Sequence, residues 1–240
     1  MKDYLDSHTH TLASGHAYST INDNIAAAKK AGLSLLAITE HGPDMDGACR
    51  PMYFQNLKVM PREYDGLTVL FGAELNILNR NGDVDLSEET CRSLDVTIAS
   101  IHPPCYFEED PDAHLEACLH VMDQPYINII GHPDDGRFPL DYKKLAEAAK
   151  EHHKLLEVNS SSLAPNAFRI NARENYKEML RWCREYETPV VVNSDAHVDA
   201  SVGDHRLAWE LLEEEKFPEE LVVNCDLEQY FSYINFKDRL

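Results

Sequence analysis

Short apolar runs alternate with amphipathic stretches along the 240-residue chain. The apolar runs are six to eight residues long and rich in β-branched and aromatic residues, which is typical of buried strands. Between them, apolar residues recur at three- and four-residue spacing, which predicts helices over residues 19–33, 140–154 and 171–186. Seven strands are predicted, at residues 4–10, 35–41, 68–75, 96–102, 127–132, 155–160 and 189–195.

The apolar runs also indicate how the strands are arranged. Segments such as LLAIT and PVVV are almost continuously apolar, as in a parallel sheet that helices cover on both faces. No linker rich in proline, glycine or serine and no low-complexity segment interrupts the alternation. We therefore predict one α/β domain over residues 1–240, wound either as a barrel or as an open sheet.

Composition narrows the possible partners and the compartment. The net charge of −20 repels polyanions, so no nucleic-acid groove is expected, and the acidic run 210–221 is interpreted as a solvated helix face. No apolar run approaches the roughly 20 residues of a membrane span, and the N-terminus lacks the pattern of a secretion signal. The six cysteines form no C-x-x-C pair, which favours reduced thiols in a cytoplasmic protein.

The polar residues at the ends of the predicted strands carry the candidate chemistry. Six of the seven predicted strands carry a side chain that can bind a metal ion at or near their C-terminal end. In a parallel barrel these ends meet at one rim, so side chains separated by almost 190 positions would converge there. The candidate ligands are His8, His10, His16, His41, Glu74, His102, His132, Asp195 and His197.

A structural role is the competing interpretation of each histidine, because H-x-H alone is a weak motif. The five other histidines fall in helical or polar segments and are expected to be structural: His114, His120, His152, His153 and His205. Glu74 is more informative, because a lone carboxylate inside an apolar run is costly to bury unless it is paired or bound to a cation. The nitrogen and oxygen donors favour a catalytic site for zinc, with manganese or iron as alternatives, and nine ligands suit three divalent ions.

Residues around the candidate ligands are predicted to support them or to contact the substrate. Asp6 is predicted to share a strand face with His8 and His10, where it would orient a ligand imidazole or form an ordinary ion pair. Candidate substrate contacts are Tyr18, Arg137, Asn159, Ser160 and Arg169.

The segments DSHTHT, AITEHGPDM, GAELNI, GHP and NSDAH, in this order, resemble the polymerase and histidinol phosphatase (PHP) superfamily. The longer segments ASGHAYST and ITEHGPDMDGA are most similar to its compact bacterial branch of trinuclear-zinc phosphatases. The resemblance implies a distorted (β/α)7 TIM-like barrel and a homotrimer. It also implies one metal held by His8, His10, Glu74 and Asp195, a second by Glu74, His102 and His132, and a third by His16, His41 and His197.

The resulting hypothesis is a hydrolase that cleaves a small phosphate monoester with a metal-activated water. Histidinol phosphate is an alternative substrate, and phosphodiester cleavage is disfavoured because the chain has no basic patch to hold a strand. A non-catalytic metal-binding protein of the same fold is the alternative from a different class. Metal-dependent amide hydrolysis is a further one, weakened because no lysine lies at the strand ends.

Overall fold

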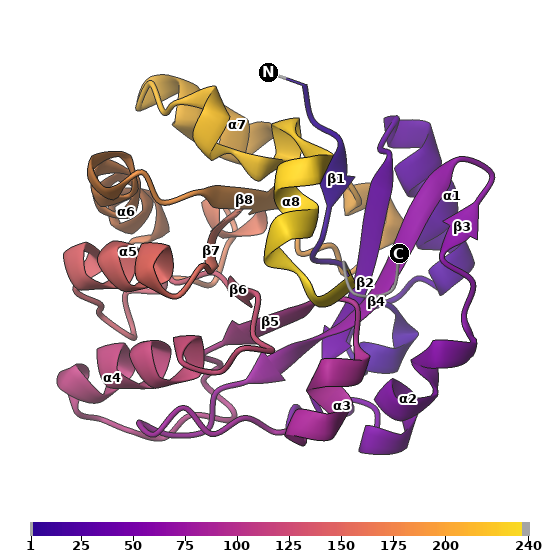
Figure 1. Cartoon of the computed structure of the whole chain (residues 1–240), viewed down its shortest axis with the longest axis horizontal. Helices are drawn as coiled ribbons and strands as arrows, with labels where there is room; N and C mark the ends of the chain where they lie inside the picture. The colour runs from indigo at the N-terminus through magenta and orange to yellow at the C-terminus, as the bar shows by residue number, and fades with distance from the viewer. Residues whose placement is uncertain (1, 237–240) are drawn as a thin grey trace.

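The computed structural model of the chain describes residues 2–236. Seven parallel strands, in the order β1-β2-β4-β5-β6-β7-β8, form a nearly closed barrel, and the short strand β3 pairs antiparallel with β4 (Figure 1). This is the distorted (β/α)7 arrangement that the resemblance implied, and it decides between a barrel and an open sheet. The strands are β1 Leu5–Asp6, β2 Leu35–His41, β3 Glu63–Tyr64, β4 Leu67–Asn76, β5 Thr97–Ser100, β6 Ile129–Ile130, β7 Leu155–Asn159 and β8 Val190–Asn193.

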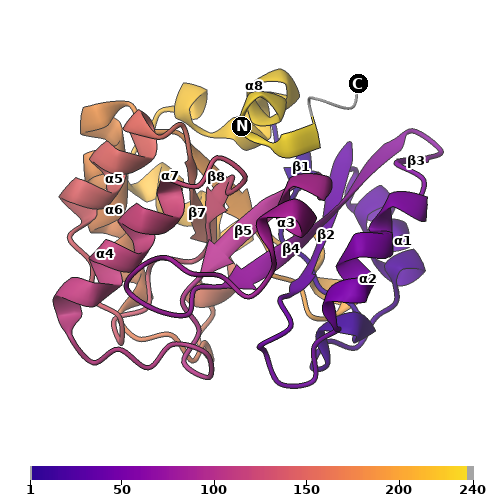
Figure 2. The ribbon, with the colours of Figure 1, turned by 60° about the horizontal axis from the view of Figure 1, so that its bottom comes forward.

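Helices surround the strands on the outside of the barrel. Helices α4, α5 and α6 lie side by side along β5–β8, whereas α1, α2 and α3 cover β2 and β4 (Figures 1 and 2). The three helices predicted from spacing are present as α1, α5 and α6, each shorter than its predicted range. The helices are α1 Ile21–Ala31, α2 Pro51–Asn56, α3 Glu88–Ser93, α4 Pro111–Met122, α5 Tyr142–Glu151, α6 Ala172–Tyr186, α7 Arg206–Glu214 and α8 Leu227–Tyr233.

The seven predicted parallel strands are confirmed, but several end earlier than predicted. Strand β6 stops at Ile130 and β5 at Ser100, two residues before the histidine that follows each of them. Beyond these points the backbone no longer forms regular pairs with the neighbouring strands, and at His132 it adopts a positive φ of 27°. The polar segments therefore lie at the strand ends as predicted, in irregular backbone rather than in the strands themselves.

Alternation along the strands separates two apolar cores. In β2, Leu35 and Ala37 pack inside the barrel, while Leu36 and Ile38 pack outside against the helices. This two-residue period is the one that a strand buried on both faces imposes.

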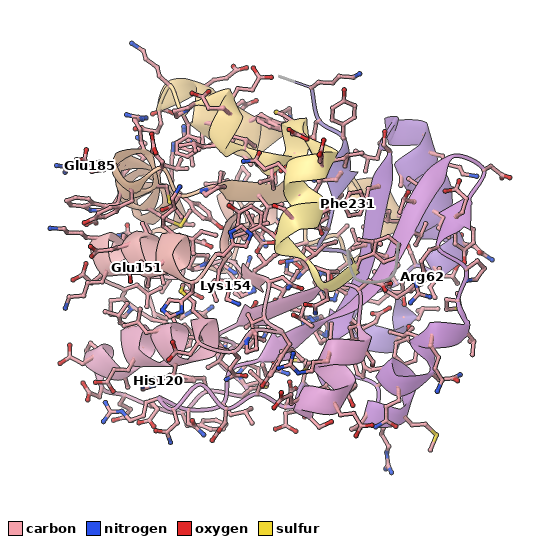
Figure 3. All side chains as sticks on the ribbon, in the orientation of Figure 1. Arg62, His120, Glu151, Lys154, Glu185 and Phe231 are labelled. Atoms are coloured by element: carbon pink, nitrogen blue, oxygen red, sulfur yellow. The ribbon has the colours of Figure 1, made fainter. Side chains whose placement is uncertain are left out.

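Helix α8 closes the N-terminal end of the barrel. It lies across the front of the strands in Figure 1, and the rotated view of Figure 2 shows it over one end of them. Tyr230 is fully buried in the interior core, together with Ile234, and Phe231 packs at its margin (Figure 3). Because this end is filled with apolar side chains, the polar residues can gather only at the opposite, C-terminal end.

Side chains close the seam between β1 and β8, where no regular ladder forms. The Nδ2 atom of Asn224 donates to the carbonyl oxygens of Leu5 and Val192 at 3.1 and 2.8 Å, and its Oδ1 accepts from Val192 N at 2.7 Å. Closer to the C-terminal rim, Ser7 N donates to Asn193 Oδ1 at 2.8 Å. One asparagine side chain therefore replaces the missing backbone hydrogen bonds between the first and last strands.

We expect Asn224→Ala to lower the free energy of unfolding by about 3 kcal/mol, because it leaves several buried backbone groups without a partner. Urea denaturation measures this loss. Asn22→Ala on α1 is the matched control, because Asn22 is exposed, and it should change stability by less than about 0.5 kcal/mol. Equal effects of the two substitutions would contradict the role of Asn224 in closing the seam.

Candidate metal centre

Donor atoms from most strands of the barrel meet at its C-terminal rim. Glu74 lies at the centre, on the longest strand, β4, and its Cα is in register with that of His41 on β2. Seven of the nine predicted ligands are buried, whereas His197 is partly exposed and His16 exposed. The structure thus brings together all nine: His8, His10, His16, His41, Glu74, His102, His132, Asp195 and His197.

Four of these side chains direct unsatisfied atoms at one point. Nε2 of His8 lies 3.3 Å from Glu74 Oε2 and 3.6 Å from Asp195 Oδ1, and Nε2 of His10 lies 3.4 and 3.2 Å from the same two oxygens. All four atoms are buried and have no hydrogen-bond partner. Neighbouring ligands of a tetrahedral zinc ion are about 3.3 Å apart when the bonds are ~2.0–2.1 Å. The four atoms therefore fit a bound cation.

The remaining donors form two further groups. Glu74 Oε1 lies 3.1 Å from Nε2 of His102 and 2.8 Å from Nε2 of His132. At the exposed side of the cluster, Nε2 of His16 lies 3.2 Å from Nε2 of His41 and 3.1 Å from Nε2 of His197. Because His41 Nδ1 also lies 2.7 Å from Glu74 Oε2, the groups are continuous with one another.

Three overlapping triplets of these residues have ligand atoms within 4.8 Å of one another, close enough for a shared metal ion: His8, His10 and Glu74; His41, Glu74 and His102; and His10, His41 and His197. His16, His132 and Asp195 lie outside these triplets and join the cluster through the pairwise distances above.

The charge states of Glu74 and His10 suit metal binding, whereas, against the effect of burial, the surrounding carboxylates raise the pKa of His8 well above its usual value, so a metal ion would displace its proton. Burial alone would raise the pKa of Glu74, but His8, His102 and His41 hold it well below its usual value, so Glu74 is a carboxylate. Burial and the neighbours His41 and His197 hold the pKa of His10 well below that of free histidine. A neutral imidazole and an ionised carboxylate are the forms that bind metal ions.

Backbone strain accompanies two of the candidate ligands. His132 and Asp195 follow β6 and β8 with φ values of 27° and 54°, a region that side chains other than glycine rarely occupy. The first is held by Glu157 Oε2, which accepts from His132 N at 2.7 Å, and the second by Asn159, which donates to Asp195 Oδ2 at 3.0 Å. Such strain is typical of functional sites, where surrounding contacts maintain it.

Glu157, on β7, is the main residue that sequence analysis missed. It is fully buried, and its Oε1 accepts from His8 Nδ1 at 2.7 Å, which leaves the other ring nitrogen facing the cluster. A carboxylate behind a ligand imidazole fixes the tautomer of that ring and raises its basicity. The signal was present in LLEVN, an apolar run with one acid, and it is the same signal that identified Glu74.

Two other candidate ligands are oriented in the same way. Nδ1 of His10 donates to Ser14 Oγ at 3.0 Å, and this hydroxyl donates to the buried Glu40 at 2.6 Å. Nδ1 of His102 donates to Asn76 Oδ1 at 2.7 Å. Ser14, Glu40 and Asn76 were also missed, because nothing in their spacing distinguishes them from structural residues.

Asp6 contacts no candidate ligand ring, so of its two predicted roles the orientation of a ligand imidazole is wrong. The regular strand ends at Asp6, and its carboxylate contacts the backbone N of His8, at 3.4 Å, rather than an imidazole of the cluster. It accepts from Ser194 N at 3.1 Å and Gly203 N at 2.9 Å and pairs with the buried His205, whose Nε2 is 3.5 Å from Asp6 Oδ1. The ion-pair alternative therefore describes Asp6, and it anchors the segment that carries Asp195.

A cavity of about 720 Å³ opens beside the cluster. Only two of the five candidate substrate contacts line it. Arg137 and Arg169 line it, and Arg169 is almost fully buried, with a nitrogen 3.2 Å from Asp195 Oδ2. Asn159 and Ser160 are buried behind the cluster and do not line the cavity, where Ser161 takes that place. The side chain of Tyr18 is 77% exposed outside it.

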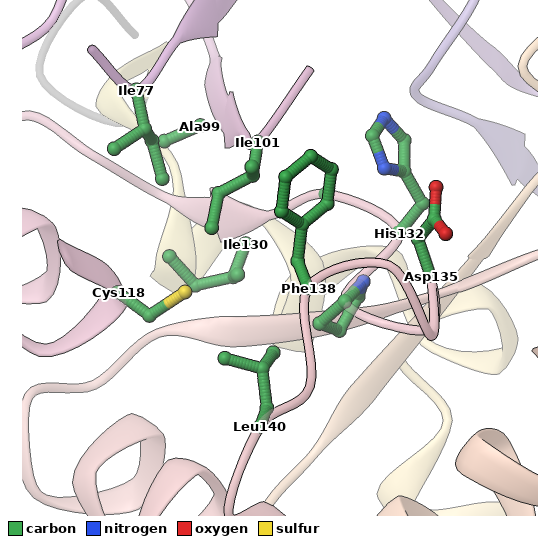
Figure 4. A pocket seen from close by; sticks show the side chains of 11 residues that line it. Ile77, Ala99, Ile101, Cys118, Ile130, His132, Asp135, Phe138 and Leu140 are labelled. Atoms are coloured by element: carbon green, nitrogen blue, oxygen red, sulfur yellow. The ribbon is translucent and has the colours of Figure 1, made fainter. Parts of the chain in front are cut away.

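A second, much smaller cavity lies between the barrel wall and α4, next to the backbone of His132 (Figure 4). Apolar side chains such as Ile77, Ile101 and Phe138 line it, and its volume of about 10 Å³ is at the limit for a single water. It therefore offers no room for a substrate.

A parallel barrel that gathers imidazoles and carboxylates at its C-terminal rim has the architecture of a metal-dependent barrel enzyme. The model of the PHP domain matches residues 6–220, and the chain belongs to this family. Within residues 2–236, no helix combines the length and the apolar character that a membrane crossing requires.

Relatives along the whole chain carry phosphatase names. A probable phosphatase of Clostridium novyi is 39% identical over 240 residues, covering 100% of this chain and 98% of the relative. A probable phosphatase of a Thermoanaerobacter species is 40% identical over 240 residues, covering 100% and 97%. Membership of this family places the chain among the phosphoric ester hydrolases.

Solved structures with the same fold are more distant in sequence. A histidinol phosphate phosphatase of Lactococcus lactis, in complex with zinc, L-histidinol and phosphate, superimposes with a TM-score of 0.64 at 21% identity. The superposition covers 90% of this chain and 95% of the Lactococcus lactis chain. A putative histidinol phosphatase of Listeria monocytogenes has a TM-score of 0.63 at 17% identity, with coverage of 85% and 99%.

The pair of His205 and Asp6 makes stability depend on pH. Burial alone would lower the pKa of His205, but the charge of Asp6 and hydrogen bonds with Asp3 and Asp6 raise it to about 10, above the 6.5 of free histidine. The stabilisation is therefore complete below about pH 6.5 and is lost as the pH rises towards 10.

We expect His205→Gln to destabilise the protein by about 3 kcal/mol or more at pH 6, because Asp6 loses its cationic partner in the interior. The difference from the unsubstituted protein should shrink between pH 6 and pH 10 in urea denaturation. A difference that stays constant across this range would show that His205 is not a charged partner of Asp6.

Proposed function

We propose that the chain hydrolyses a small phosphate monoester at a centre of three divalent ions, with zinc as the first candidate and manganese or iron as alternatives. One ion is assigned to His8, His10, Asp195 and Glu74 Oε2, because these four donors are buried and unsatisfied. This set of orphaned atoms is the observation that carries the proposal. Glu74, His102 and His132 would hold the second ion, and His16, His41 and His197 would hold the third.

Bound divalent ions would supply two things at this site: a water with a pKa lowered towards neutrality, and positive charge for the phosphoryl oxygens. The residues of the chain hold and orient these groups. Glu157 and Ser14 fix the rings of His8 and His10 so that Nε2 of each faces the centre. Asp195 uses Oδ2 to accept from Asn159 and Arg169, which leaves Oδ1 for the cluster.

Arg169 is the residue best placed to bind the phosphate. Its guanidinium lines the cavity beside the cluster, and its pKa is raised by Asp195 and Asp134 against the opposing effect of burial, so it stays charged. Burial raises the pKa of the neighbouring Asp134 to about 6. A planar guanidinium with directional N–H donors suits phosphate oxygens, and it would stabilise the charge that develops during transfer.

Metal analysis combined with a phosphatase assay tests the proposal. Protein as purified should contain about three metal ions per chain and release phosphate from simple monoesters, and a chelator should abolish this release. Glu74→Ala should lose metal and at least about a hundredfold in activity, because both of its oxygens face donor groups. His153→Ala is the control, since His153 stacks on Tyr233 far from the cluster.

Two outcomes would contradict this proposal. Full metal content without release of phosphate from any ester would favour the non-catalytic metal-binding protein. Loss of activity in His153→Ala would show that the histidines have been sorted wrongly.

Glu157→Gln tests the contact behind His8. The substitution keeps the shape of the side chain but removes the charge that strengthens the imidazole, so metal affinity should fall by about 10- to 100-fold. Competition with a chromogenic chelator measures that affinity directly. Glu151→Gln on the solvent-exposed surface of α5 is the matched control and should leave it unchanged (Figure 3). Unaltered affinity in Glu157→Gln would mean that the carboxylate only supports the fold.

A further inference from the structure

The cavity beside the cluster is larger than the phosphate group that the cluster would bind. Its volume of about 720 Å³ lies within the range of sites for whole small molecules, roughly 300–1,000 Å³. The inner wall is formed by candidate metal ligands and Arg169. The outer wall is mostly apolar and comes from loops that follow β2, β5, β7 and β8: Met45, Pro103, Pro104, Ala164, Ala167, Phe168 and Val198.

The charges around the cavity limit what the outer part can accept. Among the described residues that line it, the only carboxylate is Asp195, and its two oxygens are engaged by the cluster and by Arg169. The other lining cation, Arg137, is paired with Asp135. A cationic amine on the substrate would therefore lose water without gaining an acidic partner, which is costly.

Phe168 is the most prominent apolar group at the mouth of the cavity. Its ring is 67% exposed, and it lies next to two guanidinium groups, with the Cζ atoms of Arg137 and Arg169 at 5.3 and 5.1 Å from its centroid. These contacts hold the ring beside the residue that we assign to the phosphate. An exposed aromatic ring in this position offers a surface on which an apolar part of a ligand can pack.

We propose that the substrate is a phosphate monoester whose alcohol carries an uncharged aromatic or similarly apolar group, and that Phe168 is the specificity-determining contact for that group. The inference rests on the proposed function, because it places the phosphate at the cluster and Arg169. The apolar part then extends outward between Phe168 and the wall formed by Met45 and Pro103.

Binding of non-hydrolysable phosphonates tests this inference without turnover. Calorimetry on the metal-containing protein should show that 2-phenylethylphosphonate binds roughly tenfold more tightly than ethylphosphonate, and 2-aminoethylphosphonate no more tightly than ethylphosphonate. Phe168→Ala should remove most of the advantage of the phenyl compound and leave ethylphosphonate within about twofold. Phe107→Ala is the matched control, because Phe107 is 79% exposed but does not line the cavity, and it should change neither affinity.

The corresponding esters extend the test to catalysis, and all three are alkyl phosphates of similar intrinsic reactivity. We expect kcat/KM for 2-phenylethyl phosphate to exceed that for ethyl phosphate and 2-aminoethyl phosphate by roughly tenfold, with the difference lost in Phe168→Ala. Equal affinity for the phenyl and ethyl phosphonates, or preference for the amine, would overturn the inference. So would a Phe168→Ala variant that weakens both phosphonates equally, because the ring would then act only through Arg169. Selective binding without hydrolysis of any ester would overturn the proposed function and support the pocket assignment.

Discussion

The central feature of the structure is a buried group of imidazole and carboxylate atoms that have no hydrogen-bond partner within the protein. Imidazole nitrogens and carboxylate oxygens from strands far apart in the sequence face one another at 3.2–3.6 Å, fully enclosed, with Glu74 at the centre. Burying such groups is unfavourable unless they are protonated or share a cation. The opposite nitrogens of His8, His10 and His102 are each held by a hydrogen bond, so these rings cannot turn away from the centre.

The architecture of the barrel explains why this convergence occurs at one end only. Helix α8 and its buried aromatic side chains fill the N-terminal end, and Asn224 ties the first strand to the last. Both features hold the C-terminal strand ends at fixed separations. At that rim the chain leaves regular geometry, and the positive φ values of His132 and Asp195 are stabilised by Glu157 and Asn159. The rigid part of the barrel thus maintains strained backbone where donor atoms must point inward.

Much of the fold and of the donor set could be predicted from the sequence, because both follow from periodic burial. Apolar runs identified the seven parallel strands, and polar residues at their ends identified the side chains that meet at the rim. What was missed depends on three-dimensional contacts that leave no periodic signal. Ser14 supports His10 only because a loop folds back onto Glu40, and Asp6 pairs with His205 across about 200 positions of sequence. Glu157 had a readable signal, an acid in an apolar strand, but its strand end carried no ligand and therefore drew less attention.

The uneven distribution of charge over the protein explains how so acidic a chain could bind a phosphate dianion. A protein with a net charge of −20 should repel a phosphate dianion, yet the cavity beside the cluster presents Arg169 and Arg137 and very little negative surface. The acidic residues are concentrated elsewhere, for example on α7 and the segment after it. Recognition of the charged group is thus assigned to the donor cluster and to Arg169, and recognition of the remainder of the molecule to neighbouring loop residues that are not candidate ligands, such as Phe168. Changes in these loops can alter which alcohol is accepted while the donor cluster stays intact, which is the division that parallel barrels permit.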